Sequence, residues 1–153
     1  MSNMEIRVVE PSCPDLLHLI SKLDEDLLRR YPAEAIHGLD FNDPNIKDIV
    51  FVVAYRNSLP AGCGAIRPID KESTELKRFF VESSYRRMGI ASRMLSFLEH
   101  MARQMDFHKI RLETGTEQPE AILFYKNHGY KEIDKFGEYV HCEMSLCYEK
   151  SLT

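Results

Sequence analysis

The stretch that decides the fold is ELKRFFVESSYRRMGIA, residues 75–91. Its first part, as far as Val81, is rich in residues that favour a β-strand, and Ile90 opens an apolar stripe with helical spacing. Arg86, Arg87 and Gly89 lie between the two. Such a strand–loop–helix junction leaves backbone N–H groups free at the positive end of the helix dipole, which suits a phosphate or pyrophosphate. The alternative is a solvated basic helix start, because the P-loop and dinucleotide fingerprints are both absent.

The segments around this junction alternate between strand and helix patterns. We expect helices from residue 12 or 15 to about 31, over 90–105 and over 117–127. We expect strands over 5–10, 49–56, 61–69, 72–81, 109–113, 130–134 and 140–149. This order is typical of an α/β (α+β) fold with a mixed central sheet of about six to seven strands and helices on both faces. Residues 32–44 form a loop or short helix of the kind that carries substrate contacts.

Length and composition exclude several classes of protein. The chain has 153 residues, which suits one domain over 1–153, and 44% of them are hydrophobic, so disorder is excluded. The net charge of −4 disfavours a nucleic-acid binder. Since the sequence contains neither a membrane-length apolar run nor a signal-peptide pattern, we expect a cytosolic protein. The cysteines at 13, 63, 142 and 147 form no C-x-x-C pair, so we expect free thiols and no metal site.

Two motifs carry a family resemblance. Residues 86–91, RRMGIA, fit the pattern Q/R-x-x-G-x-G/A, with Ala91 at the last glycine position, and residues 121–130, AILFYKNHGY, fit A-x-x-F/L-Y-x-x-x-G-F/Y. Both resemble signatures of the GNAT superfamily of acetyl-CoA-dependent N-acetyltransferases, and the likeness covers roughly residues 5–149. The segments LETG (112–115), QPEA (118–121), FGEY (136–139) and CYEK (147–150) are similar to a bacterial subgroup of small-molecule acetyltransferases, some with a proposed link to indole-acetic acid production.

The resemblance implies a GNAT-like fold with acetyl-CoA as co-substrate and no metal. The junction's backbone amides would hold the pyrophosphate, and a backbone N–H around residues 79–81 would stabilise the oxyanion. The strand over 109–113 would splay from its neighbour to admit the pantetheine arm. The implied coenzyme-binding residues are Phe79, Phe80, Val81, Arg86, Arg87, Met88, Gly89, Ile90, Ala91 and Tyr125.

Acetyl transfer to an amine needs a base for the amine proton and an acid for the departing thiolate. Tyr125 matches the family tyrosine that acts as the acid, and the alternative is a tyrosine packed in the core. Glu75, eleven residues before Arg86, is the candidate base, and the alternative is an ion network with Lys77 or Arg78. Strict strand alternation places Glu75, Lys77, Phe79 and Val81 on one face, and Leu76, Arg78 and Phe80 on the other.

The acceptor side is predicted from polar residues on interior strands and loops. Arg67, Lys77 and Arg78 would suit an acceptor that carries a carboxylate, and Tyr139 lies in a loop that could cover it. Each of these residues could instead form a structural ion pair. The predicted function is transfer of an acetyl group from acetyl-CoA to a primary amine of a small molecule, by direct attack in a ternary complex. The alternatives are a protein or peptide N-acetyltransferase and a non-catalytic acyl-CoA sensor. The resemblance also allows a homodimer, for which the sequence gives no interface pattern.

Overall fold

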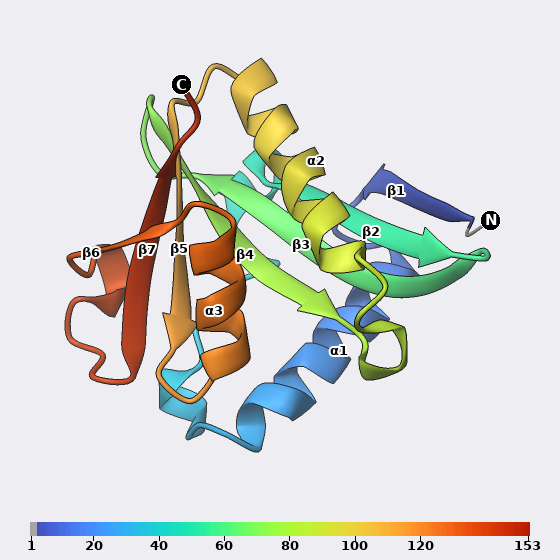
Figure 1. Ribbon diagram of the computed structural model, residues 1–153, viewed down its shortest axis with the longest axis horizontal. Coiled ribbons are helices and arrows are strands. Elements are labelled where there is room, and N and C mark those ends of the chain that lie inside the picture. Colours follow the sequence, from blue (N-terminus) through green and yellow to red (C-terminus); the bar gives the residue numbers. More distant parts are fainter. Residues whose placement is uncertain (1–2) are drawn as a thin grey trace.

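The computed structural model describes residues 3–153, which form a seven-stranded sheet with the order β1-β2-β3-β4-β5-β7-β6 (Figure 1). β4 and β5 are parallel, and the other neighbouring pairs are antiparallel. The expected mixed sheet is therefore confirmed. The strands are β1 Met4–Val9, β2 Val50–Arg56, β3 Leu59–Pro68, β4 Ser73–Val81, β5 Lys109–Gly115, β6 Lys131–Ile133 and β7 Ser145–Ser151.

Three α-helices within residues 3–153 cover the two faces of the sheet: α1 Pro14–Leu28, α2 Ile90–Gln104 and α3 Pro119–Asn127. α2 and α3 lie on one face and α1 lies on the other (Figure 1). The apolar stripe predicted for α2 is buried against the sheet, and its Leu98 side chain is fully buried. In the described residues no helix has the length and apolarity needed to cross a membrane.

β4 contains a β-bulge that the sequence analysis did not predict. Arg78 has a positive φ of 51°. On β3 the pairing passes from Cys63 to Ala65, while on β4 it passes from Phe80 to Lys77, so β4 has one extra residue there. A bulge of this kind changes which face the following side chains occupy.

The predicted distribution of side chains between the faces of β4 is therefore wrong beyond the bulge. Phe79 packs with Leu76 on the side of α2 and α3, whereas Phe80 packs with the α1 cluster. Gly64 lies across from the bulge, where an added Cβ would come within 3.1 Å of the Phe79 ring. The glycine thus permits the close approach of backbone and ring that its place in a strand indicated.

The last strand was predicted to begin at residue 140, but β7 begins at Ser145. Residues before it form a 3-10 turn, Gly137–Tyr139, and two further turns. In these turns Cys142 N–H donates to the Tyr139 carbonyl at 3.0 Å and Ser145 N–H donates to the Cys142 carbonyl at 3.3 Å. These local hydrogen bonds replace ladder pairing, and they leave Tyr139 1% exposed in the interior.

Candidate active site

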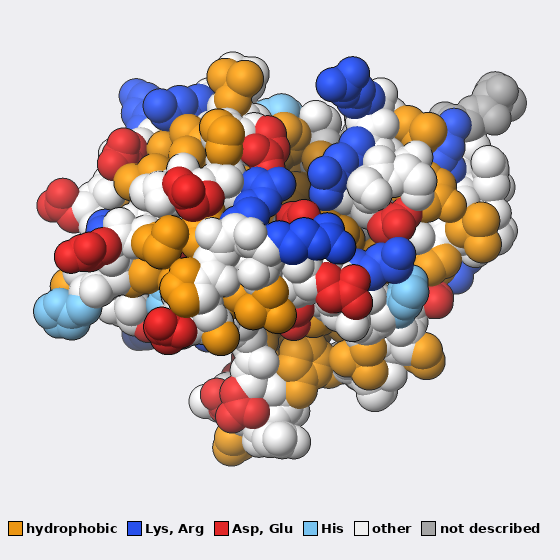
Figure 2. All heavy atoms as spheres, turned by 90° about the horizontal axis from the view of Figure 1, so that it is seen from below, with side chains coloured by type: hydrophobic (Ala, Val, Ile, Leu, Met, Phe, Trp, Pro, Cys, Tyr) orange, Lys and Arg blue, Asp and Glu red, His pale blue; other side chains and the backbone are white. Residues whose placement is uncertain are grey.

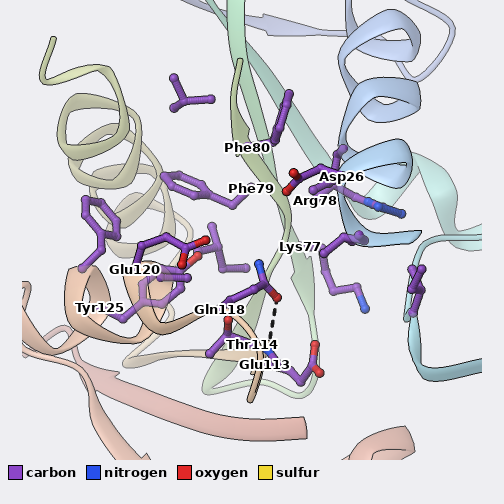
Figure 3. Close-up of a pocket in the computed structure, with 18 of the residues that line it drawn as sticks. Asp26, Lys77, Arg78, Phe79, Phe80, Glu113, Thr114, Gln118, Glu120 and Tyr125 are labelled. Carbon is purple, nitrogen blue, oxygen red and sulfur yellow. Dashed lines mark hydrogen bonds between the residues drawn. The ribbon is translucent and has the colours of Figure 1, made fainter. Parts of the chain in front are cut away.

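β4 and β5 separate partway along their length. Their pairing runs from Ser73 opposite Lys109 to Leu76 opposite Leu112, and both strands then continue, to Val81 and Gly115. The opening holds a cavity of about 480 Å³, lined by both strands, by α1 and α3, and by the start of α2 (Figure 3). The splay implied by the family resemblance is thus confirmed.

The start of α2 forms one end of this cavity. Gly89 is the N-cap, with a left-handed φ of 78° that favours glycine, and Arg93 N–H donates to its carbonyl at 3.1 Å. The backbone N–H groups that precede Arg93 therefore have no hydrogen-bond partner within the helix. Arg86 and Arg87 line the cavity, and Arg86 Nε donates to the Val81 carbonyl at 3.1 Å.

The other predicted coenzyme residues are placed around the same end. Phe79, Phe80, Val81 and Ala91 line the cavity. Gly89 and Ile90 line a smaller adjoining hollow of about 230 Å³. Met88 lines neither cavity and is 46% exposed. Because its side chain is apolar, only its backbone N–H could bind an anion. Figure 2, which views the molecule from below, shows Lys and Arg side chains near the middle of this face with Asp and Glu among them.

Tyr125 lies on α3 where that helix faces the opening (Figure 3). Its ring centroid is 6.3 Å from that of Phe79 and 5.4 Å from that of Phe124. Burial raises the pKa of the Tyr125 phenol, with a further increase from the charge of Glu113. The phenol is therefore protonated at neutral pH, and it both packs against aromatic neighbours and lines the cavity.

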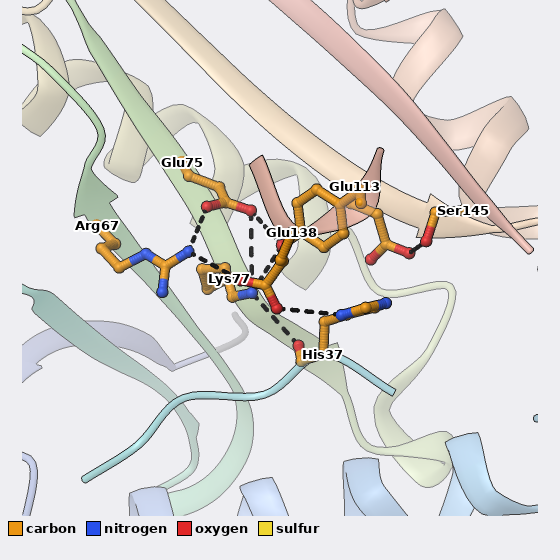
Figure 4. A network of polar contacts seen from close by, with 8 residues as sticks. His37, Arg67, Glu75, Lys77, Glu113, Glu138 and Ser145 are labelled. Carbon is orange, nitrogen blue, oxygen red and sulfur yellow. Dashed lines mark hydrogen bonds and ion pairs between the residues drawn. The ribbon is translucent and has the colours of Figure 1, made fainter. Parts of the chain in front are cut away.

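Glu75 lies in a buried network (Figure 4). One carboxylate oxygen accepts from Arg67 Nη2 at 2.7 Å, and the other accepts from the Tyr139 hydroxyl. Lys77 Nζ lies 3.9 Å from Glu75 and donates to the Tyr139 hydroxyl at 2.7 Å. The structure thus joins Arg67, Glu75, Lys77 and Tyr139, but only Lys77 and Tyr139 line the cavity. Glu75 therefore lies in an ion network that includes Lys77, which the sequence analysis gave as the alternative to a role as base.

Two further contacts complete the acceptor end. Lys77 Nζ donates to the His37 carbonyl at 3.3 Å, and His37 Nδ1 lies 3.1 Å from a Glu138 carboxylate oxygen. Burial lowers the pKa of the Lys77 amine, although nearby carboxylates oppose the shift. Arg78, which also lines the cavity, pairs with Asp24 of α1 at 2.6 Å. Every predicted acceptor residue therefore already has a protein partner.

Sequence reasoning missed Glu113. It lies on β5 just beyond the last residue paired with β4, lines the cavity, and accepts from Ser145 Oγ at 2.6 Å. Burial raises the pKa of its carboxyl, and the hydrogen bond from Ser145 and the charges of His37 and Lys77 oppose that shift. The available signal was a glutamate at the end of a strand expected to splay. Among residues 3–153 no group of three or more His, Cys, Asp or Glu side chains is placed to hold a metal ion.

Known proteins share both this fold and the sequence pattern. The model of the Acetyltransferase (GNAT) family matches residues 16–130. An IAA acetyltransferase from Azospirillum brasilense is 38% identical over 154 residues, covering 99% of this chain and 100% of that protein. A solved structure from Klebsiella pneumoniae, assigned as an acyl-CoA N-acyltransferase, is 28% identical with a TM-score of 0.87 and 98% coverage of each chain. The PaiA N-acetyltransferase of Thermoplasma acidophilum, solved with coenzyme A, shares the fold at 20% identity with a TM-score of 0.73, over 97% of this chain and 99% of that one. This chain therefore belongs to the GNAT family of acetyltransferases.

Proposed function

We propose that this acetyltransferase moves an acetyl group from acetyl-CoA to a primary amine of a small molecule, by direct attack within a ternary complex. The observation that carries the proposal is the cavity itself. It extends from Arg86 and Arg87 at the start of α2, past Tyr125, to Lys77 and Tyr139 at the other end. Acetyl-CoA enters as a substrate and would supply the acetyl group as a thioester.

The chain's own groups fit the coenzyme. The free N–H groups at the start of α2 and two guanidinium groups suit a pyrophosphate. Beyond Leu76, the edge of β4 that turns away from β5 offers backbone donors and acceptors to an extended amide chain such as the pantetheine arm. The apolar walls from Phe79 and Phe124 limit access of water.

The chemistry needs one acid, one oxyanion donor and one base. The buried Tyr125 phenol is suited to protonate the departing thiolate, because it keeps its proton at neutral pH. A backbone N–H of residues 79–81 would stabilise the oxyanion, and in support of this role all three residues line the cavity. Glu75 is the candidate base derived from the sequence, and its link to the cavity runs through the Tyr139 hydroxyl and Lys77.

The closed acceptor end favours a small molecule over a protein. His37 contacts both Lys77 and Glu138, so the segment before β2 is joined to the turn before β7 across this end. A protein acceptor would need an open groove. Lys77 and Arg78 on the cavity wall favour an acceptor with a carboxylate in addition to its amine.

The test is release of free thiol from acetyl-CoA with a panel of amino acids, polyamines, aminoglycosides and short peptides. We expect turnover with one class of small amine and a much lower rate for Tyr125→Phe. Acetylation of the peptides alone would favour the protein acceptor. Coenzyme binding without turnover would favour the sensor, and replacing Glu75 and Tyr125 together would then leave binding unchanged.

A further inference from the structure

We infer that Glu113 binds the ammonium group of the acceptor and takes its proton, so that the acceptor is a cationic primary amine. This inference rests on the proposed acetyl transfer and gives it a base and a substrate charge. Glu113 lies on β5 one residue beyond Leu112, the last residue of β5 that pairs with β4. It therefore stands where the two strands diverge and where the cavity begins (Figure 3).

The hydrogen bonds of Glu113 leave it one oxygen for a substrate. Ser145 Oγ, on β7, donates to Oε2 at 2.6 Å (Figure 4). Within residues 3–153 no donor bonds to Oε1. The hydrogen bond from β7 thus fixes the carboxylate through Oε2, and Oε1 remains available to a substrate. An anchored carboxylate with one free oxygen is suited to bind an ammonium N–H and to accept its proton.

Charge balance supports a cationic ligand at this position. The acids that line the cavity are Asp26, Glu113 and Glu120. Arg30 lies 3.9 Å from Asp26 and 2.5 Å from Glu120. Among the described residues Glu113 has no ion pair within 4 Å. A partly buried carboxylate without a direct ion pair is costly. The charges of His37 and Lys77 offset part of this cost, and an ammonium group from the substrate would add a direct ion pair.

Glu75 is less suited to this role. Its two oxygens are occupied, one by Arg67 and the other by the Tyr139 hydroxyl, and it does not line the cavity. The structure assigns it to positioning: it holds Tyr139 and Lys77 at the acceptor end. Glu113 thus takes the role of base that the sequence analysis expected of Glu75, and Glu75 keeps a positioning role.

The proton balance of the reaction follows. The ammonium N–H bond breaks with its electron pair on nitrogen, and the proton moves to Glu113 Oε1. The neutral amine attacks the thioester carbonyl, so a C–N bond forms and the C–S bond breaks with its electron pair on sulfur. Tyr125 protonates the sulfur, and the second proton lost from nitrogen restores the phenol. Glu113 then returns the first proton to solvent, so that one proton is released per amide formed.

Several titratable groups surround Glu113 and share in its pH dependence. The charge of each of these groups affects the pKa of Glu113, or the charge of Glu113 affects theirs. They are Tyr31 and His37 in the segment between α1 and β2, Glu75 and Lys77 on β4, Tyr125 on α3, Tyr139 in the turn before β7, and Cys147 on β7.

The test compares two kinds of nucleophile in the thiol-release assay. Ethylamine and ethanolamine are cationic at neutral pH and need a base, whereas hydroxylamine is already neutral. We expect Glu113→Gln to lower kcat/KM for the alkylamines by about 100-fold, and to lower the hydroxylamine rate far less. Equal losses for both nucleophiles, or no loss, would overturn the inference. So would a wild-type protein that uses hydroxylamine but neither alkylamine. If the wild-type protein acetylates none of these nucleophiles, the proposed function itself fails. This outcome is distinct from failure of the inference, because it is seen in the wild-type protein alone.

Ser145→Ala provides a matched control that keeps the carboxylate. In the native protein the hydrogen bond from Ser145 lowers the pKa of Glu113, and this substitution removes that bond. The acidic limb of kcat/KM against pH, which reports the free base, should therefore move to higher pH in Ser145→Ala, and Glu113→Asp should keep a limb. An acidic limb that is unchanged in Ser145→Ala would contradict the assignment of that limb to Glu113.

Discussion

Replacing Glu75 by Gln tests whether this carboxylate supports the site or acts as the base. Glu75 and Lys77 have side chains that are 2% and 3% exposed, and their charged atoms lie 3.9 Å apart. The substitution leaves the Lys77 ammonium buried without that counter-charge. Breaking a buried pair by removing one partner costs about 3–5 kcal/mol. We expect the lower end, about 3 kcal/mol, because the Gln carbonyl can still accept from Arg67.

Urea unfolding measures this free-energy change, provided the m-value is unchanged. A loss of about 3 kcal/mol corresponds to a fall in Tm of about 6–12 °C for a chain of this length. Because burial already lowers the pKa of Lys77, the loss should shrink as rising pH deprotonates this amine. Glu138→Gln is the control, since Glu138 contacts Arg67 at 3.5 Å but is 45% exposed, and it should cost less than about 1 kcal/mol.

Two results would contradict a supporting role for Glu75. One is a loss in Glu75→Gln no larger than that of the Glu138→Gln control. The other is a kcat/KM profile whose acidic limb disappears in Glu75→Gln while stability is unchanged, which would identify Glu75 as the base.

Three further predictions concern the remaining parts of the site. Tyr125→Phe should lower kcat by about 100-fold, as expected for loss of a general acid, while calorimetry shows unchanged affinity for acetyl-CoA. Arg87→Ala should weaken acetyl-CoA binding by about tenfold, through loss of a charge-assisted contact; calorimetry at high salt should show a smaller difference. Glu113→Gln should raise the free energy of unfolding at neutral pH, because burial raises the pKa of Glu113 and its ionised form therefore opposes folding. Urea unfolding should show this gain disappearing as acid protonates the wild-type carboxyl, and a destabilised variant at neutral pH would contradict the expectation.

The sequence predicted the parts of the fold that depend on local pattern. The start of α2 at Ile90 and the end of β4 at Val81 are where the apolar spacing placed them. The junction between them lies at the cavity as expected. Helical and strand periodicities depend only on neighbouring residues, so one sequence is sufficient to identify them.

The bulge at Arg78 could not be predicted in this way. It depends on pairing with β3 and coincides with an ion pair to Asp24, fifty-four residues away in the chain. The role of Glu113 was missed for a similar reason. Its exposure to the cavity follows from where β4 and β5 separate, and its anchor, Ser145, comes from the far end of the chain. Long-range contacts of this kind leave no periodic signal in the sequence.

A crystal structure of the protein with coenzyme A would show whether the β4–β5 opening is the coenzyme site. We expect the pyrophosphate to lie on the N–H groups before and within the first turn of α2. The pantetheine arm should follow the open edge of β4, and the sulfur should lie within hydrogen-bonding reach of the Tyr125 hydroxyl. Coenzyme bound outside the β4–β5 opening, or a sulfur atom remote from Tyr125, would contradict this expectation.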